Sequence, residues 1–222
     1  MLSKLLSYLI PIKIFKTKSK LSKTIEITWA NGELVMDSEN TNYSYGSLQR
    51  ILRKGLMRFG FEKIAKMEHI LVLGVAGGSV IKTLVDEIHF EGQITGVDID
   101  AAIIKIANEY FKLDEIKNLK IIIDDAFEFV LKTKDRYDLI IIDVFQDTTM
   151  PNFLFEKFFI NRICFLLKSK GIVLFNTMCL TAGDNFRNQN FIKDFDYDNC
   201  KIQSIPRIEL HNELIIIEKF IK

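Results

Sequence analysis

The chain has few cysteines, no long apolar run and almost no net charge. Its three cysteines, Cys164, Cys179 and Cys200, are widely spaced and form no C-x-x-C pair. Because disulfide frameworks and zinc sites need closely grouped ligands, this spacing predicts reduced thiols in a cytoplasmic protein and no metal site. The net charge of +1 supplies no field of one sign, so no nucleic-acid partner is expected.

The N-terminal stretch lacks acidic residues but is rich in lysine. Lysines stand at positions 4, 13, 16, 18, 20 and 23, and the first acid is Glu26. The apolar run Leu5–Ile10 is broken by Pro11 and is far shorter than the roughly 20 residues of a membrane-spanning helix. We therefore expect no signal peptide and no stable membrane insertion. A solvated basic leader is favoured over a membrane-surface segment.

A small β segment follows the leader. Two strand-like runs, TIEITWA and ELVMD, flank Asn31-Gly32, and Asn-Gly is the strongest short hairpin signal because both residues tolerate positive φ. This pattern predicts a hairpin within a small N-terminal segment, residues 1–45. Residues 46–222 would then form the main domain.

The main domain alternates between short apolar runs and helical patterns. The runs are continuous rather than alternating, as expected when helices cover both faces of a parallel sheet. The fold class is therefore α/β, a Rossmann-like doubly wound sheet, with a C-terminal antiparallel edge pair from KIQSIPRIELHNELIIIEKF. Residues 181–199 are polar and are expected to form a loop. The expected strands are ILVLG, QITGVDI, LKIIID, YDLIIID and GIVLFNT, and the expected helices are 78–88, 101–111, 126–133 and 152–168.

The ends of these strands carry glycines and acids. In such sheets ligands bind at the carboxyl ends of the strands. The first strand runs into Gly74-Val75-Ala76-Gly77-Gly78, which would let main-chain N–H groups approach a ligand. A dinucleotide fingerprint needs glycine where Ala76 stands, so that class is not matched.

The acids suggest a nucleoside ligand. Asp98 ends the second strand 24 residues after Gly74, and an acid at about this sequence separation can accept hydrogen bonds from the ribose hydroxyls. Asp124-Asp125 at the third strand end could accept a hydrogen bond from an adenine amine. S-adenosylmethionine is the common ligand that is a nucleoside without pyrophosphate. Simpler interpretations stay open, because strand-end acids often cap helices, as expected for Asp100, and glycine turns also serve helix packing.

Four stretches between Thr24 and Thr177 resemble the spermidine synthase-like branch of the class I S-adenosylmethionine-dependent transferases. The most specific is IIIDDAFEFV, and the others are GVDIDAAIIKIANEYF, DLIIIDVFQDTTMPNFLFEKFF and GELVMDSENTNYSYGSL. The resemblance implies that Asp98 binds the ribose and Asp125 the adenine of S-adenosylmethionine or its decarboxylated form, without a metal. It implies a catalytic Asp143, with Asp147 and Tyr45 at the acceptor pocket. The residues expected to bind the donor are Gly74, Val75, Ala76, Gly77, Gly78, Asp98, Ile99, Asp125, Ala126 and Asp143.

The chain also departs from this family's pattern where the polyamine would bind. Gly77 stands where aminopropyltransferases carry the aspartate that holds the donor's amine, and Gly46 and Ser47 replace two polar residues after the pocket tyrosine. A polycation needs paired carboxylates to offset its desolvation, and several of these are missing. Nucleoside recognition is therefore expected to persist, whereas polyamine recognition is weakened.

Three functions are compatible with this pattern. We favour methyl transfer from S-adenosylmethionine to a small acceptor, with Asp143 orienting or deprotonating it. Aminopropyl transfer to a polyamine is the alternative, and a non-catalytic nucleoside-binding module is the third. The resemblance makes a homodimer reasonable. His69, His89 and His211 have no metal-ligand spacing and are interpreted as surface or satisfied core residues.

Overall fold

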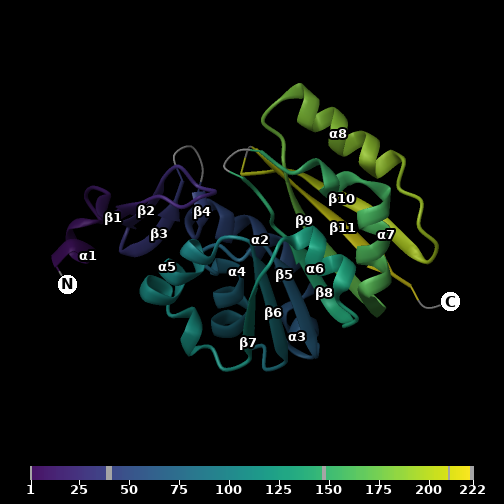
Figure 1. Ribbon diagram of the computed structural model, residues 1–222, viewed down its shortest axis with the longest axis horizontal. Helices are drawn as coiled ribbons and strands as arrows, with labels where there is room; N and C mark the ends of the chain where they lie inside the picture. Colours follow the sequence, from purple (N-terminus) through teal and green to yellow (C-terminus); the bar gives the residue numbers. More distant parts are fainter. Residues whose placement is uncertain (1, 39–41, 147–148, 210, 221–222) are drawn as a thin grey trace.

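The computed structural model describes residues 2–38, 42–146, 149–209 and 211–220, and contains two separate sheets. The small sheet lies at one end of the molecule, and the C-terminal strands with helix α8 lie at the other (Figure 1). The larger, seven-stranded sheet lies between them, and its strands end in the glycines and acids from which a ligand site is predicted.

The small sheet has the order β1-β2-β3-β4 and is antiparallel throughout. Asn31 and Gly32 have φ values of 50° and 78° between β2 and β3, so the predicted hairpin is confirmed. The basic leader is more ordered than expected, because it forms a short helix and the edge strand β1. The elements are α1 (Leu2–Leu6), β1 (Ile12–Thr17), β2 (Ile25–Ala30), β3 (Glu33–Asp37) and β4 (Asn42–Ser44).

The large sheet confirms the predicted doubly wound α/β class. Its order is β10-β11-β9-β8-β5-β6-β7, with β9 to β7 parallel and the last two strands antiparallel. The chain runs from β5 outward through β6 and β7 and returns to β8 on the other side of β5, which places the topological switch point between β5 and β8. The strands are β5 (His69–Leu73), β6 (Gln93–Asp98), β7 (Leu119–Ile123), β8 (Tyr137–Ile142), β9 (Leu167–Met178), β10 (Cys200–Ile208) and β11 (Asn212–Lys219).

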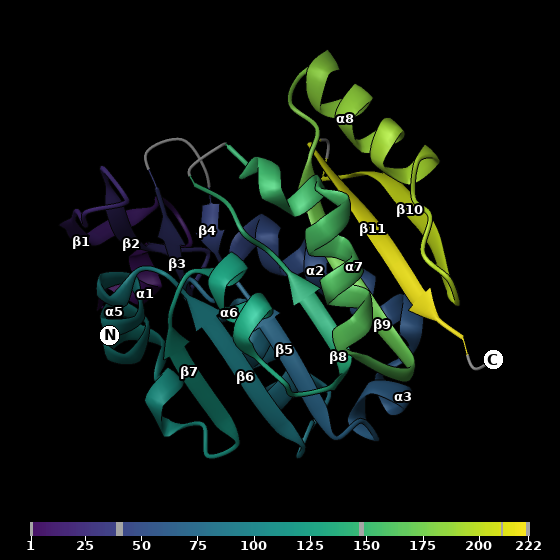
Figure 2. The same ribbon diagram turned by 45° about the vertical axis from the view of Figure 1, so that its right-hand side comes forward.

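Helices cover both faces of this sheet, which explains the continuous apolar runs. Ile70 and Val72 of β5 pack into one core with α2 and α4, while Leu71 and Leu73 pack into a second core with α6 and α7. Figure 2 shows α6 and α7 in front of the sheet and α2 behind it. The helices are α2 (Gly46–Phe59), α3 (Phe61–Ala65), α4 (Ser79–Lys82, continued by a π-helical turn Thr83–Glu87), α5 (Ala101–Phe111), α6 (Ala126–Lys132), α7 (Lys157–Leu166) and α8 (Ala182–Lys193).

Two expectations for the C-terminal half were wrong. Residues 181–199 were expected to form a loop, but α8 occupies most of this stretch. It begins with a capping box in which Thr181 and Asp184 satisfy each other's backbone N–H groups. The helix expected over 152–168 is divided, because a 3₁₀ turn over Asn152–Phe155 precedes α7 and β9 already begins at Leu167.

Candidate active site

A cavity of about 440 Å³ opens at the carboxyl ends of β5, β6, β7 and β8. This volume is in the usual range for small-molecule sites, and its position at the switch point is the one expected for a doubly wound sheet. The strand-end residues that line it are Gly74, Val97, Asp98, Asp124, Asp125 and Asp143. The residues from which a nucleoside site was predicted therefore share one cavity.

Only part of the glycine turn faces this cavity. Gly74 and Ala76 belong to the described lining, whereas Val75, Gly77 and Gly78 do not. Val75 is buried, and a Cβ on Gly77 or Gly78 would collide with Ser44 or Leu113 respectively. Two of the five residues expected to contact the donor thus line the described cavity, and the other three are closely packed; the donor contacts of all five stay predictions.

Gly74 brings two strand ends into contact. Its φ is 86°, and a Cβ at this position would collide with the carbonyl oxygen of Asp143. The Asp143 N–H donates to the Leu73 carbonyl at 2.8 Å, so the main chains after β5 and β8 are held together at the switch point. Glycine is required here for both its backbone angle and its missing side chain.

The Asp98 carboxylate braces the glycine turn. Its Oδ2 accepts from the N–H groups of Val75 at 3.0 Å and Ala76 at 2.9 Å, and its Oδ1 accepts from the Asp100 N–H at 2.9 Å. Burial raises the pKa of Asp98 above its usual value, and these three hydrogen bonds oppose the shift. Asp98 lines the cavity while fixing the turn, so its predicted contact with a ribose would be made from a rigid position.

Replacing Asp98 by alanine tests both roles. Because three N–H groups would lose their acceptor, we expect Asp98→Ala to lower the free energy of unfolding by about 2 kcal/mol and to weaken adenosine-nucleoside binding at least tenfold. Urea denaturation and titration calorimetry with methylthioadenosine measure the two effects. Asp135→Ala, at an exposed carboxylate, should change neither; unchanged affinity in Asp98→Ala would remove this residue from the site.

The acids that follow β6 and β7 also cap helices. Asp100 caps α5 by accepting from the Ala102 N–H at 3.0 Å, as predicted. Asp125 caps α6, with its Oδ1 accepting from the Phe127 N–H at 2.7 Å. Asp125 is therefore a helix cap, as the simpler interpretation of strand-end acids predicts. It also lines the cavity, as does Ala126. Its predicted contact with adenine stays a prediction.

Asp143 lies at one end of a short chain of hydrogen-bonded polar side chains. Its Oδ1 accepts from the Asn176 amide at 2.9 Å, and the Asn176 Oδ1 in turn accepts from the Asn212 amide at 3.0 Å. Burial raises the pKa of Asp143 to about 7, against the smaller opposing effect of the Asn176 hydrogen bond. A carboxyl that titrates near neutral pH at the end of a parallel strand is suited to accept or deliver a proton.

The N- and C-terminal parts of the chain also line the cavity, which the sequence analysis does not predict. Leu21 and Ser22 line the cavity, and the nearby Ser19 hydroxyl donates to the Asp100 carboxylate. The C-terminal part contributes Glu209 and His211. The sequence-based prediction follows the glycine turn and the acids after the parallel strands, so it does not point to these segments, although Glu209 directly follows β10. In that prediction His211 is a surface or satisfied core residue.

The charge of Glu209 is already compensated. Its carboxylate pairs with Lys54 at 2.9 Å and Arg50 at 3.2 Å. Hydrogen bonds from Arg50 and Lys54 lower the pKa of Glu209 below its usual value. Ser47 lines the same part of the cavity, where the related transferases were expected to carry an acid. Two neighbouring positions therefore offer little unpaired negative charge to a bound cation.

Tyr45, another predicted catalytic residue, packs on an aromatic side chain. The Tyr45 ring stacks on Phe111 with centroids 4.4 Å apart, and Tyr45 is absent from the described lining of the cavity. Burial raises the pKa of its hydroxyl. The predicted role of Tyr45 at the acceptor pocket stays a prediction. Asp147 lies outside the residues that the structure describes.

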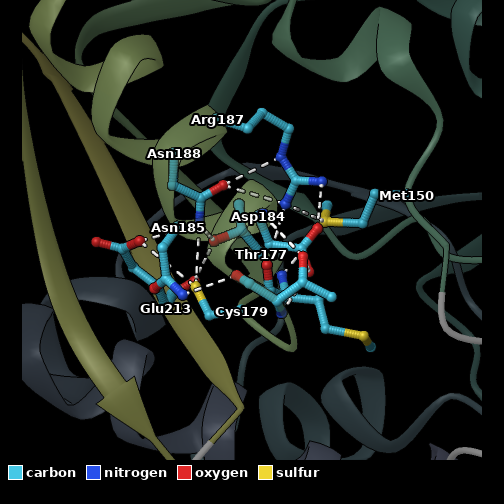
Figure 3. Close-up of polar contacts among 10 residues, drawn as sticks. Met150, Thr177, Cys179, Asp184, Asn185, Arg187, Asn188 and Glu213 are labelled. Atoms are coloured by element: carbon cyan, nitrogen blue, oxygen red, sulfur yellow. Dashed lines mark hydrogen bonds and ion pairs between the residues drawn. The ribbon is translucent and has the colours of Figure 1, made fainter.

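Helix α8 fixes one side of the cavity from outside (Figure 3). Arg187 donates to the carbonyl of Met178, a lining residue, at 3.0 Å and lies 4.2 Å from the Phe155 ring centroid. The buried Asn188 amide donates to Thr177 at 2.8 Å and to Glu213 at 2.9 Å. These contacts join α8 to β9 and β11, so the segment expected to be a loop instead supports the site.

Comparison with known proteins identifies the family. The family model described as "Spermine/spermidine synthase domain" matches residues 50–197, which is more than half of the chain. The chain belongs to the spermine/spermidine synthase family. This agrees with the resemblance inferred from the sequence, and the fold is that of the class I S-adenosylmethionine-dependent methyltransferases.

Members of this family and its neighbours differ in what they transfer. A polyamine aminopropyltransferase of Vibrio vulnificus is 31% identical over 115 residues, 50% of this chain and 38% of that protein. An eEF1A lysine and N-terminal methyltransferase homolog of Drosophila melanogaster is 25% identical over 161 residues, 64% of this chain and 23% of that protein. The match thus spans less than half the length of either relative.

The family resemblance extends to the whole architecture. The crystal structure of spermidine synthase from Thermotoga maritima superposes with a TM-score of 0.69 at 18% identity, covering 95% of this chain and 74% of that one. At this identity the likeness establishes the fold alone. In the described ranges 2–38, 42–146, 149–209 and 211–220, no group of three His, Cys, Asp or Glu could hold a metal ion.

Proposed function

We propose that this member of the spermine/spermidine synthase family transfers an alkyl group from an adenosyl sulfonium donor to an amine. Aminopropyl transfer to a small di- or polyamine is the form that the family and the Vibrio relative support best. The observation that carries the proposal is the position of the half-buried Asp143 carboxyl in the same cavity as Asp98 and Asp125, where burial raises its pKa to about 7.

The donor half of the cavity would use the strand-end residues. Asp98 would accept hydrogen bonds from the ribose hydroxyls, since its Oδ1 has only one described N–H partner. Asp125 would accept from the adenine amine, because the described N–H partners of its carboxylate all reach Oδ1. Ile99 and Ala126 line the same region and offer apolar surface to the base.

Asp143 would act on the acceptor. An amine is protonated at neutral pH, so it must lose a proton before its nitrogen lone pair can attack. The Asp143 carboxylate takes a proton from the ammonium group, and the freed nitrogen lone pair then attacks the carbon attached to sulfur. The carbon–sulfur bond breaks, and its electron pair stays on sulfur as a neutral thioether. Asp143 then releases its proton to water, so the net products are the alkylated amine in its ammonium form, the thioether and one proton.

Methyl transfer is the second candidate, and Gly77 is the observation that favours it. The resemblance implies that an aspartate at this position holds the donor's amine in aminopropyltransferases. Here a side chain at Gly77 would collide with the Cβ of Ser44, 2.7 Å from the ideal Cβ position. A donor that needs no carboxylate there, such as S-adenosylmethionine, is compatible with this arrangement. The Drosophila relative carries a methyltransferase name.

A two-donor assay tests the proposal and separates its forms. The purified chain would be incubated with putrescine or spermidine, and with either decarboxylated S-adenosylmethionine or S-adenosylmethionine, and the amines analysed by mass spectrometry. We expect an aminopropyl mass increment with the decarboxylated donor. A methyl increment would select the second candidate. Donor binding by calorimetry without any amine product would instead indicate a nucleoside-binding module and overturn the proposal.

A further inference from the structure

Positive charge is concentrated at the N-terminal end of the chain. Residues 1–23 contain six lysines and no acidic residue, a formal charge of +6, whereas the whole chain carries +1. The remaining residues therefore carry a formal charge of −5. The lysines at 4, 13, 16, 18, 20 and 23 are all exposed, and α1 and β1 lie at one end of the molecule (Figure 1).

Large apolar side chains are exposed in the same segment. Leu2, Leu5, Leu9 and Ile10 are 71%, 62%, 83% and 65% exposed. Their backbone is nevertheless held in place: Ser7 is buried, its hydroxyl accepts from the Gly32 N–H at 2.9 Å, and its carbonyl accepts from the Asn31 N–H at 3.0 Å. The hairpin tip thus anchors a segment in which both leucines and lysines are exposed to solvent.

We propose that residues 2–23 form a docking surface for an anionic lipid bilayer. An anionic bilayer has negatively charged headgroups above an apolar acyl region. The exposed lysines can pair with the headgroups, and the exposed leucines can enter the apolar region beneath them. Lys13 and Lys16 pair with Glu26 at 2.6 and 2.9 Å, whereas Lys18, Lys20 and Lys23 form no ion pair with any described residue. These three supply the unpaired charge.

Other partners suit only the lysines or only the leucines. A nucleic acid would neutralise the lysines but would leave the leucines in water. A second copy meeting this face across a two-fold axis would bury the leucines but would place the same lysines against one another. None of the described helices has the length and apolar character to span a bilayer, so the proposed attachment is peripheral.

The docking surface also lies next to the cavity. Leu21 and Ser22 belong to the same segment and line the cavity wall. The contact between Ser19 and Asp100 ties the segment to the start of α5. Lipid attachment through residues 2–23 would therefore hold the cavity close to the bilayer surface, without requiring any change in the catalytic residues.

Vesicle co-sedimentation of the full chain tests this proposal. We expect binding to phosphatidylcholine vesicles containing phosphatidylglycerol at least tenfold tighter than to phosphatidylcholine alone, and weaker binding at high salt. The triple variant Lys18→Gln/Lys20→Gln/Lys23→Gln should lose about fivefold in affinity per lysine, or about a hundredfold in all. Leu9→Ser/Ile10→Ser should weaken binding without changing its salt dependence.

A matched charge control keeps the result specific. Lys63→Gln/Lys66→Gln/Lys117→Gln removes the same charge from exposed positions elsewhere and should bind anionic vesicles like the wild type. Equal or absent binding to the two kinds of vesicle would overturn the proposal. So would a dimer, seen by analytical ultracentrifugation, that dissociates in the Leu9→Ser/Ile10→Ser variant. Transfer to soluble amines should be unchanged in all these variants, which separates this proposal from the proposed function.

Discussion

Asp143→Asn is expected to lower the rate of group transfer by about 10²- to 10⁴-fold, the usual contribution of a positioned general base. Asparagine keeps an oxygen that can accept from the Asn176 amide, so the local hydrogen bond at 2.9 Å can persist while the proton-accepting carboxylate is lost. Steady-state assays with the donor and amine identified above would measure the loss. Calorimetry should show donor affinity within a few-fold of the wild type.

The pH dependence of the wild type follows from the same residue. Because burial raises the pKa of Asp143 to about 7, the carboxylate form is scarce below that pH. We expect kcat/KM to rise about tenfold per pH unit below 7 and to level off above it. Asp143→Asn should lack this rise, and Asp114→Asn, at an exposed position, should retain it. A flat wild-type profile between pH 5.5 and 8.5 would contradict the role of Asp143.

Stability should change with pH in the opposite direction. The pKa of Asp143 in the folded chain lies above the value of about 3.9 for an unfolded aspartate, so the folded state holds its proton more tightly between pH 4 and 7. Ionisation therefore lowers the free energy of unfolding as pH rises through this window. We expect Asp143→Asn to be about 2–4 kcal/mol more stable than the wild type at pH 8, and much closer to it at pH 4. Urea denaturation at both pH values measures the difference.

Gly74→Ala is expected to have the largest effect on folding among substitutions in the glycine turn. A Cβ at Gly74 would collide with the carbonyl of Asp143, and the φ of 86° is itself unfavourable for alanine. Because the colliding atom is main chain at the switch point, the ends of β5 and β8 would have to separate. We expect loss of donor binding together with reduced stability.

Gly60→Ala is a closely matched control. Gly60 also has a φ of 86°, but a Cβ there would meet nothing within 4 Å. Gly60→Ala should cost only the backbone penalty of about 1–3 kcal/mol, and Gly74→Ala should cost about 1–3 kcal/mol more from the collision. Gly183→Ala, inside α8 and without a close neighbour, should be neutral or slightly stabilising. Equal losses in Gly74→Ala and Gly60→Ala would show that the contact with Asp143 does not matter.

The sequence predicted those parts of the molecule whose signals are local. Continuous apolar runs such as ILVLG indicate strands covered on both faces, and Asn31-Gly32 indicates a hairpin because of its backbone angles. Parallel strands end at one edge of the sheet, so Gly74, Asp98 and Asp143 could be placed together before any contact was known. The close packing of Gly77 and Gly78 could not be predicted, because a glycine required for packing looks the same in sequence as one required for binding.

The parts that were missed depend on contacts between distant segments. Helix α8 has a weak apolar pattern and is held by polar contacts of Arg187 and Asn188 with β9 and β11, which no window of the sequence contains. Leu21 and His211 reach the cavity only because the chain ends are carried back to it. The helix and edge strand of the basic leader could not be predicted either, because Ser7, which anchors it to the hairpin tip, is a single small residue.

The origin of the outer cavity wall has a consequence for comparing this chain with its relatives. The matched stretch, residues 50–197, contains Gly74, Asp98, Asp125 and Asp143, whereas Leu21, Ser22, Glu209 and His211 lie outside it. Similarity over that stretch thus covers the strand-end residues of the cavity but not the lining that comes from the flanking segments. If the proposed function is correct, two chains could share residues 50–197 and still differ in the part of the cavity that meets the nucleophile.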